Sequence, residues 1–448
     1  MSIPPAPRIN SRQVWRLAWP TITAAVLTTC LGLIHFKIVA HLGSDALATV
    51  TAGQRLFFML QALLMGLSVA VTTVVAQAWG AGNRERATGD SWQGLYLGGL
   101  IAVLILLAVI VFSDDIPIWF GLAGNTADLT SRFIVITTAF SIFFSLSLIL
   151  PAALRAVGDA RTPLRYAWGA TAINIGLCWL LVNGHWGFPA LGSLGIAWGT
   201  GLAPAIAFTL LLWHWYRGGL PLPSAPPPAI NREAWKRLLK LGTPAAAEQV
   251  VLHTGLLLFL RLVADYGTDA YAAYGIGLSL LATVIVVGYG FSIAASTLAG
   301  QCAGAGRRDL AKLSAFKTLK LSGAILTVLA LLFVANARAL ADFMTPNTDV
   351  AELTETFVTV LGLLMPLLTI ELTLAGVLRG LGDTRFPLVA TASGLGCRLL
   401  LGGVVLALEA DIVWLFATLI ADYALKALLI SWRFAKQDWN PDPISARP

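Results

Sequence analysis

Three carboxylic acids lie within long apolar stretches of this chain, where a charge is costly. They are Glu248, Glu371 and Asp422. A charged side chain at the centre of a bilayer costs about 2.5–3.5 kcal/mol by insertion scales, so such residues usually face a partner or an internal cavity. A buried carboxyl group that gains and loses a proton can couple proton flow to another event. These acids are therefore candidates for ion coupling, and His35 joins them because imidazole titrates near neutral pH.

Each acid also has a structural interpretation that the sequence leaves open. Asp422 and Lys426 are four residues apart and can form an ion pair on one helix face. Glu248 and Glu371 can instead make hydrogen bonds across helices, for example to Arg398 or Tyr274. His35 is as compatible with a hydrogen-bonded packing residue as with a proton-responsive one.

Basic and polar side chains in apolar stretches other than those of the three acids are candidates to line a substrate cavity. Long basic side chains near helix ends can instead extend to the membrane surface, as Lys37 and Arg261 would. The six cavity candidates are Lys37, Gln54, Arg55, Asn174, Tyr274 and Arg398.

The sequence contains no motif for an enzyme. It has no phosphate-binding G-x-x-x-x-G-K-[ST], no paired Asp motif for a metal-bound pyrophosphate, and no Cys/His spacing for a metal. Its four cysteines lie far apart in apolar stretches, which argues against disulfides. We therefore expect no catalytic residue, no metal site and no cofactor, and a drive other than ATP.

The composition places the chain in a membrane. Hydrophobic residues make up 57% of it and charged residues 12%, about half the charged fraction of a typical soluble domain. Apolar stretches of about 20 residues can cross a bilayer as helices, and these do not alternate as barrel strands would. Twelve are present, at 17–40, 47–79, 95–113, 133–154, 165–183, 190–215, 238–263, 270–303, 318–337, 355–378, 388–408 and 412–432.

Charges in the loops alternate in sign along the chain. The termini and the loops after even-numbered spans are rich in Lys and Arg, such as Arg307 and Arg308, whereas the odd loops carry acids such as Asp114 and Asp115. Lys and Arg mark the cytoplasmic side, so both termini are expected there. This bias also explains the net charge of +7 without a nucleic-acid partner.

The chain repeats itself with an offset of 224 residues. QAWGAGNRERA begins at Gln77 and QCAGAGRRDLA at Gln301, and LRAVGDARTPL at Leu154 matches LRGLGDTRFPL at Leu378. The predicted architecture is all-α, with twelve transmembrane helices in two six-helix repeats around a central cavity. Parallel repeats of this kind occur in transporters, with the substrate path between them. The expected parts are an N-lobe (1–215), a Pro-rich cytoplasmic linker (216–237) and a C-lobe (238–448).

These repeated motifs resemble the multidrug and toxic compound extrusion (MATE) family, within the wider superfamily that includes polysaccharide and lipid-linked flippases. The Q-x-x-G-A-G and L-R-x-x-G-D-x-R-x-P-L motifs occur in both halves, and the resemblance covers essentially the whole chain. It implies export of organic solutes in exchange for protons or sodium ions, by alternating access of two lobes.

The sequence departs from the family pattern at two acids of the first repeat. In LGLIHFKIVAHLG, His35 stands where many members have Asp, and in NIGLC, Asn174 is kept but Cys178 replaces a second Asp. In the second repeat Glu248 matches the pattern. Glu371 lies one turn after the usual acid, where this chain has Leu368.

We therefore expect an antiporter that exports amphipathic or cationic small molecules in exchange for protons. Sodium coupling is one alternative. Export or flipping of anionic or lipid-linked substrates is another, because His35, Lys37 and Arg55 are positive candidates in a half without its usual acids. The expected setting is a bacterial-type inner membrane, with membrane lipid and a small-molecule substrate as partners and a monomer as the functional form.

Overall fold

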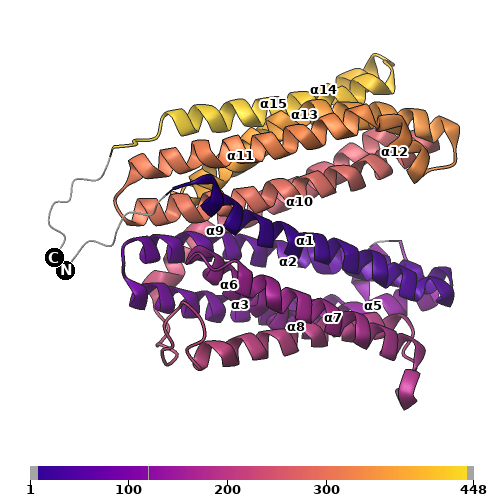
Figure 1. Ribbon diagram of the computed structural model, residues 1–448. Helices are drawn as coiled ribbons and strands as arrows, with labels where there is room; N and C mark the ends of the chain where they lie inside the picture. The colour runs from indigo at the N-terminus through magenta and orange to yellow at the C-terminus, as the bar shows by residue number, and fades with distance from the viewer. Residues whose placement is uncertain (1–8, 120, 441–448) are drawn as a thin grey trace. The chain divides into compact units, whose positions relative to one another are not determined.

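The computed structural model describes residues 9–119 and 121–440 of the chain. Every regular element in this part is a helix (Figure 1), as expected where lipid offers no partner for free backbone groups. The outermost ends of the two predicted lobes, 1–8 and 441–448, lie outside the described residues.

The helices follow the predicted apolar stretches closely. The first repeat contains α1 (Ser11–Val39), η1 (Ala40–Leu42), α2 (Ser44–Gly80), α3 (Arg84–Phe112), α4 (Asp115–Trp119), α5 (Gly124–Ala139), α6 (Ser141–Ala156), α7 (Arg161–Asn183), η2 (His185–Gly187) and α8 (Ser193–Tyr216). The second contains α9 (Arg232–Ala264), α10 (Thr268–Gly304), α11 (Arg308–Ala335), α12 (Ala337–Met344), α13 (Thr348–Gly380), α14 (Arg385–Ala407) and α15 (Ile412–Ala435).

The membrane spans agree with the twelve-helix prediction. Within the described residues, 10 helices are long and apolar enough to cross a membrane, and a bent pair supplies one more. The remaining predicted span is α7, a helix of 23 residues. The protein is therefore a multi-pass membrane protein.

The fourth predicted span is broken in the structure. The sequence suggested one helix over 133–154, but α5 and α6 meet at Phe140 with a bend of 45°. Phe140 packs against Gly201 of α8, where a β-carbon would collide with its ring. It also lies edge-on to Trp198, with ring centroids 5.5 Å apart.

The described chain forms two compact units. Of the described residues, unit 1 contains 9–22, 80–82 and 247–440, and unit 2 contains 23–79, 83–119 and 121–246. The first helix of each repeat therefore changes unit, α1 after Ile22 and α9 after Ala246. These two points are again 224 residues apart, and each follows a helix-internal proline, Pro20 or Pro244.

Unit 1 is organised around α13, which packs against α10, α11 and α15 (Figure 1). Gly376 and Gly380 of α13 lie directly against the backbone of Ser292 and Ser296 of α10, with no room for a β-carbon. Small residues four apart on both helices allow this close approach, as is common in membrane proteins.

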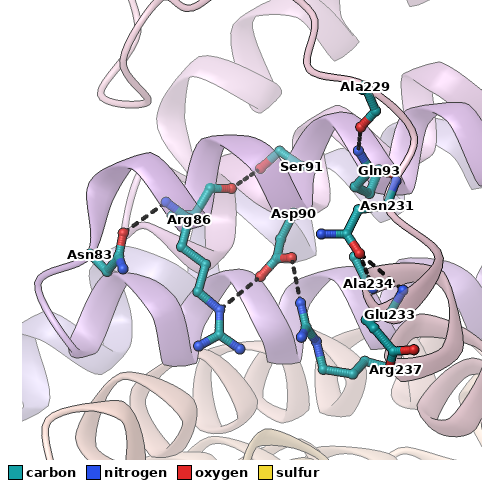
Figure 2. Close-up of polar contacts among 11 residues, drawn as sticks. Asn83, Arg86, Asp90, Ser91, Gln93, Ala229, Asn231, Glu233, Ala234 and Arg237 are labelled. Carbon is teal, nitrogen blue, oxygen red and sulfur yellow. Dashed lines mark hydrogen bonds and ion pairs between the residues drawn. The ribbon is translucent and has the colours of Figure 1, made fainter. Parts of the chain in front are cut away.

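The Pro-rich linker is fastened to unit 2 rather than left as a free connector. Gln93 of α3 donates to the Ala229 carbonyl (2.8 Å) and accepts from the Asn231 amide (2.9 Å), as Figure 2 shows in part. Tyr96 of α3 donates to the Pro228 carbonyl (3.1 Å). One face of α3 therefore holds the backbone of the linker at three points, Pro228, Ala229 and Asn231.

An ion pair extends this attachment beyond the end of the linker. Asp90, one turn before Gln93 on α3, lies 3.3 Å from Arg237 of α9 (Figure 2). Arg86 lies on the other side of the same carboxylate, at 3.6 Å. The start of α9 is thus held by the same helix as the linker that leads into it.

We predict that Gln93→Leu loosens the linker. Each lost hydrogen bond removes about 1 kcal/mol, so the open state becomes more populated and tryptic cleavage at Arg232 accelerates several-fold. Limited proteolysis of the purified protein measures this. Gln437→Leu, at the C-terminal end, is the control that leaves the rate unchanged. An unchanged rate in the Gln93 variant would show that these bonds do not hold the linker.

Candidate functional site

The candidates of the first repeat converge on His35 of α1. Its Nε2 lies 2.7 Å from Asn174 Oδ1 on α7, and its Nδ1 lies 3.0 Å from Gln54 Nε2 on α2. Asn174 also donates to the Gly199 carbonyl of α8 at 3.3 Å. Three candidates that are distant in sequence are therefore brought together by four helices.

A neutral imidazole satisfies this arrangement. Nε2–H donates to Asn174 and Nδ1 accepts from Gln54, so neither ring nitrogen lacks a partner. His35 is only 3% exposed. A second ring proton would face the Gln54 amide nitrogen, which is also a donor, so protonation requires that amide to turn.

Cys178 of α7 completes this cluster. The sequence showed that Cys178 replaces an acid of the family pattern, but it did not predict a contact with His35. Its Sγ lies 3.2 Å from Asn174 Oδ1 and 3.7 Å from His35 Nε2. Gly199 makes room for the thiol, because a β-carbon there would collide with Sγ. The two positions where family members often carry acids are thus neighbours, and here they hold an imidazole and a thiol.

Lys37 and Arg55 are not part of the cluster. Both side chains are exposed, and neither forms an ion pair within the described residues. They belong to the same two helices as His35 and Gln54, α1 and α2.

Glu248 of α9 forms a buried ion pair in unit 1. Its Oε1 lies 2.6 Å from Arg379 Nη2 of α13 and accepts from the Thr391 hydroxyl of α14 at 3.2 Å. Arg379 also approaches the Ser292 hydroxyl of α10, at 3.4 Å. Both charged side chains are less than a tenth exposed, so the pair joins four helices in an apolar environment.

The role of Arg379 was not apparent from the sequence, because this residue directly follows the tenth predicted span, 355–378, where a charge is expected in a loop. Arg379 lies in the last turn of α13, one residue before the end of the helix. The sequence feature that could have indicated a helical position for Arg379 is the motif LRGLGD, in which it directly follows the helical Leu378.

Asp422 of α15 belongs to a second buried group. Lys426 Nζ lies 2.7 Å from Asp422 Oδ1, which confirms the pairing expected from their spacing. Arg398 of α14 lies 4.0 Å away and donates to the Tyr274 hydroxyl at 3.0 Å. Gly394 leaves space for this ion pair, since a β-carbon would collide with Asp422 and Lys426.

Glu371 differs from the other two acids. It is 6% exposed, yet its side chain makes no hydrogen bond or ion pair within the described part of the chain. The charged groups that act on it electrostatically are Lys426 and Arg379, together with the acids Glu248 and Asp422. It is thus a buried carboxyl group between two neutralised pairs.

The two repeats use the same positions for different chemistry. Adding 224 to His35 and Asn174 gives Phe259 and Arg398. These residues are also in contact, with the Arg398 guanidinium 3.6 Å from the centroid of the Phe259 ring. The contact is retained, but an uncharged pair in the first repeat corresponds to a cation over an aromatic ring in the second.

The fold and these sites define a class of protein. Two similar sets of apolar helices, with ionisable side chains buried inside each compact unit, are typical of a membrane transporter. No cluster of three His, Cys, Asp or Glu side chains suited to a metal ion lies among the described residues.

The family model called MatE matches residues 20–180 and 244–404, and the two matched segments are themselves offset by 224. The chain therefore belongs to the MATE family, whose members are transporters and not enzymes. Two similar curated proteins agree. The probable multidrug resistance protein NorM of Thermotoga maritima is 27% identical over 388 residues, covering 85% of this chain and 82% of the relative. The multidrug resistance protein NorM of Burkholderia vietnamiensis is 26% identical, covering 96% and 95%.

Solved structures share the fold. A MOP superfamily transporter from Pyrococcus furiosus superposes with a TM-score of 0.88 at 17% identity, covering 95% of each chain. The Vibrio cholerae MATE transporter VcmN gives a TM-score of 0.88 at 18% identity, covering 96% of this chain and 98% of that one. At this level of identity the likeness concerns the fold alone.

We predict that Arg379→Met strongly destabilises the protein. It leaves the Glu248 carboxylate buried without its partner, a change that typically costs about 3–5 kcal/mol. The double variant Glu248→Leu/Arg379→Met removes both charges and should recover much of the loss. Thermal melting in detergent measures the effect. In the control Arg338→Met, an exposed ion pair with Asp342 is lost and melting changes little. A single variant as stable as wild type would mean that Glu248 is not ionised in the folded protein.

Proposed function

We propose that this protein is an efflux transporter that exports amphipathic organic cations in exchange for protons. The curated relatives named as multidrug resistance proteins support the export of varied organic compounds. The observation that carries proton coupling is Glu371, a buried carboxyl group without a salt-bridge partner among the described residues.

Glu371 is suited to exchange a proton because both of its states are tolerated. The cations that act electrostatically on its carboxylate are Lys426 and Arg379. Neither cation holds the carboxylate in a direct pair, so protonation breaks no ion pair. Glu248, by contrast, is held in a direct ion pair by Arg379 and also accepts a hydrogen bond from Thr391.

The cluster of the first repeat supports coupling in the second. His35, Gln54, Asn174 and Cys178 contribute no carboxylate. Sodium is a hard cation that, like calcium and magnesium, prefers oxygen ligands, and a pair of acids at positions 35 and 178 would supply carboxylate oxygens. An imidazole and a thiol do not. The proposal therefore favours protons over sodium ions and assigns Asp422 a structural role beside Lys426.

In this mechanism the two lobes expose the substrate alternately to the two sides of the membrane. A proton from outside neutralises Glu371, and release of that proton inside restores its charge. The partners are a small-molecule substrate and membrane lipid, the monomer is the functional form, and no cofactor takes part. We place the protein in a bacterial-type inner membrane with both termini in the cytoplasm.

A second candidate function rests on Lys37 and Arg55. These exposed cations have no ion pair within the described residues, and the neutral cluster on the same two helices offers no carboxylate to balance them. Such surroundings attract anionic or lipid-linked substrates.

We predict that Glu371→Gln abolishes proton-driven export. The amide keeps the shape of the side chain but cannot carry a proton. Efflux of a fluorescent cationic dye from proteoliposomes, driven by a pH gradient without sodium, should fall to the level of protein-free liposomes. Glu355→Gln, an exposed change on the same helix, is the control that retains transport.

Three outcomes separate the alternatives. If dye efflux persists in the Glu371 variant but is lost in Glu248→Gln, proton coupling is assigned to Glu248 in its pair with Arg379 instead of to Glu371. Wild-type efflux that needs a sodium gradient contradicts proton coupling. A wild type that moves no cationic dye contradicts the cationic cargo.

In that last case anionic cargo is tested next. Lys37→Ala and Arg55→Ala should then abolish uptake of an anionic dye while protein levels stay normal. Unchanged uptake in both variants would exclude this candidate function.

A further inference from the structure

The face of α3 that holds the linker in unit 2 has an equivalent face on α11 in unit 1. Adding 224 to Trp92, Gln93 and Tyr96 gives Phe316, Lys317 and Lys320. The two polar residues that bind the linker backbone in the first repeat are therefore both lysines in the second.

In unit 2 the side-chain amide of Gln93 and the hydroxyl of Tyr96 are hydrogen-bonded to the linker. Gln93 bonds to Ala229 and Asn231, and Tyr96 bonds to Pro228 (Figure 2 shows Gln93 beside the linker). Trp92 stacks on Trp215 of α8, with ring centroids 4.8 Å apart. The linker thus supplies the hydrogen-bonding groups that this part of α3 requires.

In unit 1 the equivalent face is open. Phe316 is 53% exposed and Leu313 is 43% exposed, and Lys312 and Lys320 are exposed as well. Lys317 is half-buried. These lysines form no ion pair among the described residues, and Asp309, the acid on the same helix, is already bound to Arg307.

The position of this face on the helix points to the membrane surface. α11 ends at Ala335, and a helix needs about 20 residues to cross the hydrocarbon core. Counting back from Ala335, the boundary of the core falls close to Phe316. Lys317 and Lys320 therefore start at or just inside that boundary, and their side chains must extend to the headgroup level to keep their charge solvated.

We propose that Lys312, Lys317 and Lys320 form a binding site for the phosphate of an anionic phospholipid, with Leu313 and Phe316 packing against its acyl chains. The residues 313, 316, 317 and 320 follow the i, i+3, i+4, i+7 spacing of one helix face. Lys312 lies one turn before Phe316, closer to the start of α11 at Arg308. The lipid phosphate would bind the polar side chains of α11 at the positions where the linker backbone binds those of α3.

The charges and shape of the face favour a lipid over a peptide strand. An extended backbone offers carbonyl groups to which Gln and Tyr can donate, as in unit 2, whereas three lysines within nine positions select a full negative charge. The exposed Phe316 ring, edge-on to Phe434 of α15 at 6.0 Å between centroids, adds an apolar floor beside them.

The test is binding of two defined lipids by native mass spectrometry of the detergent-purified protein. The wild type should bind dioleoyl-phosphatidylglycerol more tightly than dioleoyl-phosphatidylcholine. Lys312→Gln/Lys317→Gln/Lys320→Gln should weaken phosphatidylglycerol binding by about fivefold for each lysine removed and leave phosphatidylcholine binding unchanged. Replacing the same lysines by Arg should retain the preference.

A matched variant, Arg232→Gln/Lys236→Gln/Lys240→Gln, removes three exposed basic residues from the start of α9 and should keep the wild-type preference. Equal weakening in both triple variants would mean that only net charge matters and would overturn the site. An unchanged preference in the α11 variant would overturn it as well. Displacement of the lipid by inorganic phosphate would assign the lysines to free phosphate instead of a phospholipid.

Discussion

A charge that is removed from water needs a partner, and this requirement explains how two of the buried acids of unit 1 are arranged. In unit 1, Glu248 is held by Arg379 and Asp422 by Lys426, each pair almost fully buried. An isolated charge in such surroundings would cost several kcal/mol, so the helices that carry the partners are fixed against one another. α9, α13, α14 and α10 meet at the Arg379 pair, and glycines on α13 and α14 let the helices and the side chains come close enough. Glu371 is the exception, because it is the buried acid of unit 1 without a hydrogen-bond or ion-pair partner in the described structure.

The second theme is divergence between two copies of one six-helix unit. His35 with Asn174, and Phe259 with Arg398, occupy the same positions and keep the same contact. In one copy the contact is a hydrogen bond between neutral groups, and in the other it places a cation over an aromatic ring. Duplication supplied the geometry, and separate substitutions then gave the halves different electrostatics.

The equivalent helices α3 and α11 also differ between the two copies. In the first copy the Pro-rich linker follows α8 and lies along α3, where Gln93 and Tyr96 form hydrogen bonds to its backbone. In the second copy the corresponding positions of α11 are both lysines, on a face where Phe316 and Lys320 are exposed. The face of α3 thus contacts the linker in unit 2, whereas the equivalent face of α11 is exposed in unit 1. The residue types of the two faces differ in keeping with this.

The class of fold could be predicted from the amino-acid sequence, because apolar length and loop charge reflect the bilayer directly. Twelve helical segments, the 224-residue repeat and the MATE family follow from patterns that are local or periodic. The Asp422–Lys426 pair was also accessible, since its residues are four apart on one helix. By contrast, only the tertiary structure showed which side chains that are distant in sequence contact one another. It paired Glu248 with Arg379 across 131 positions, brought Cys178 to His35, left Glu371 without a partner among the described residues, and bent the fourth span at Phe140. These outcomes depend on how helices rotate and approach one another, which side-chain packing sets and which no spacing along a single helix encodes.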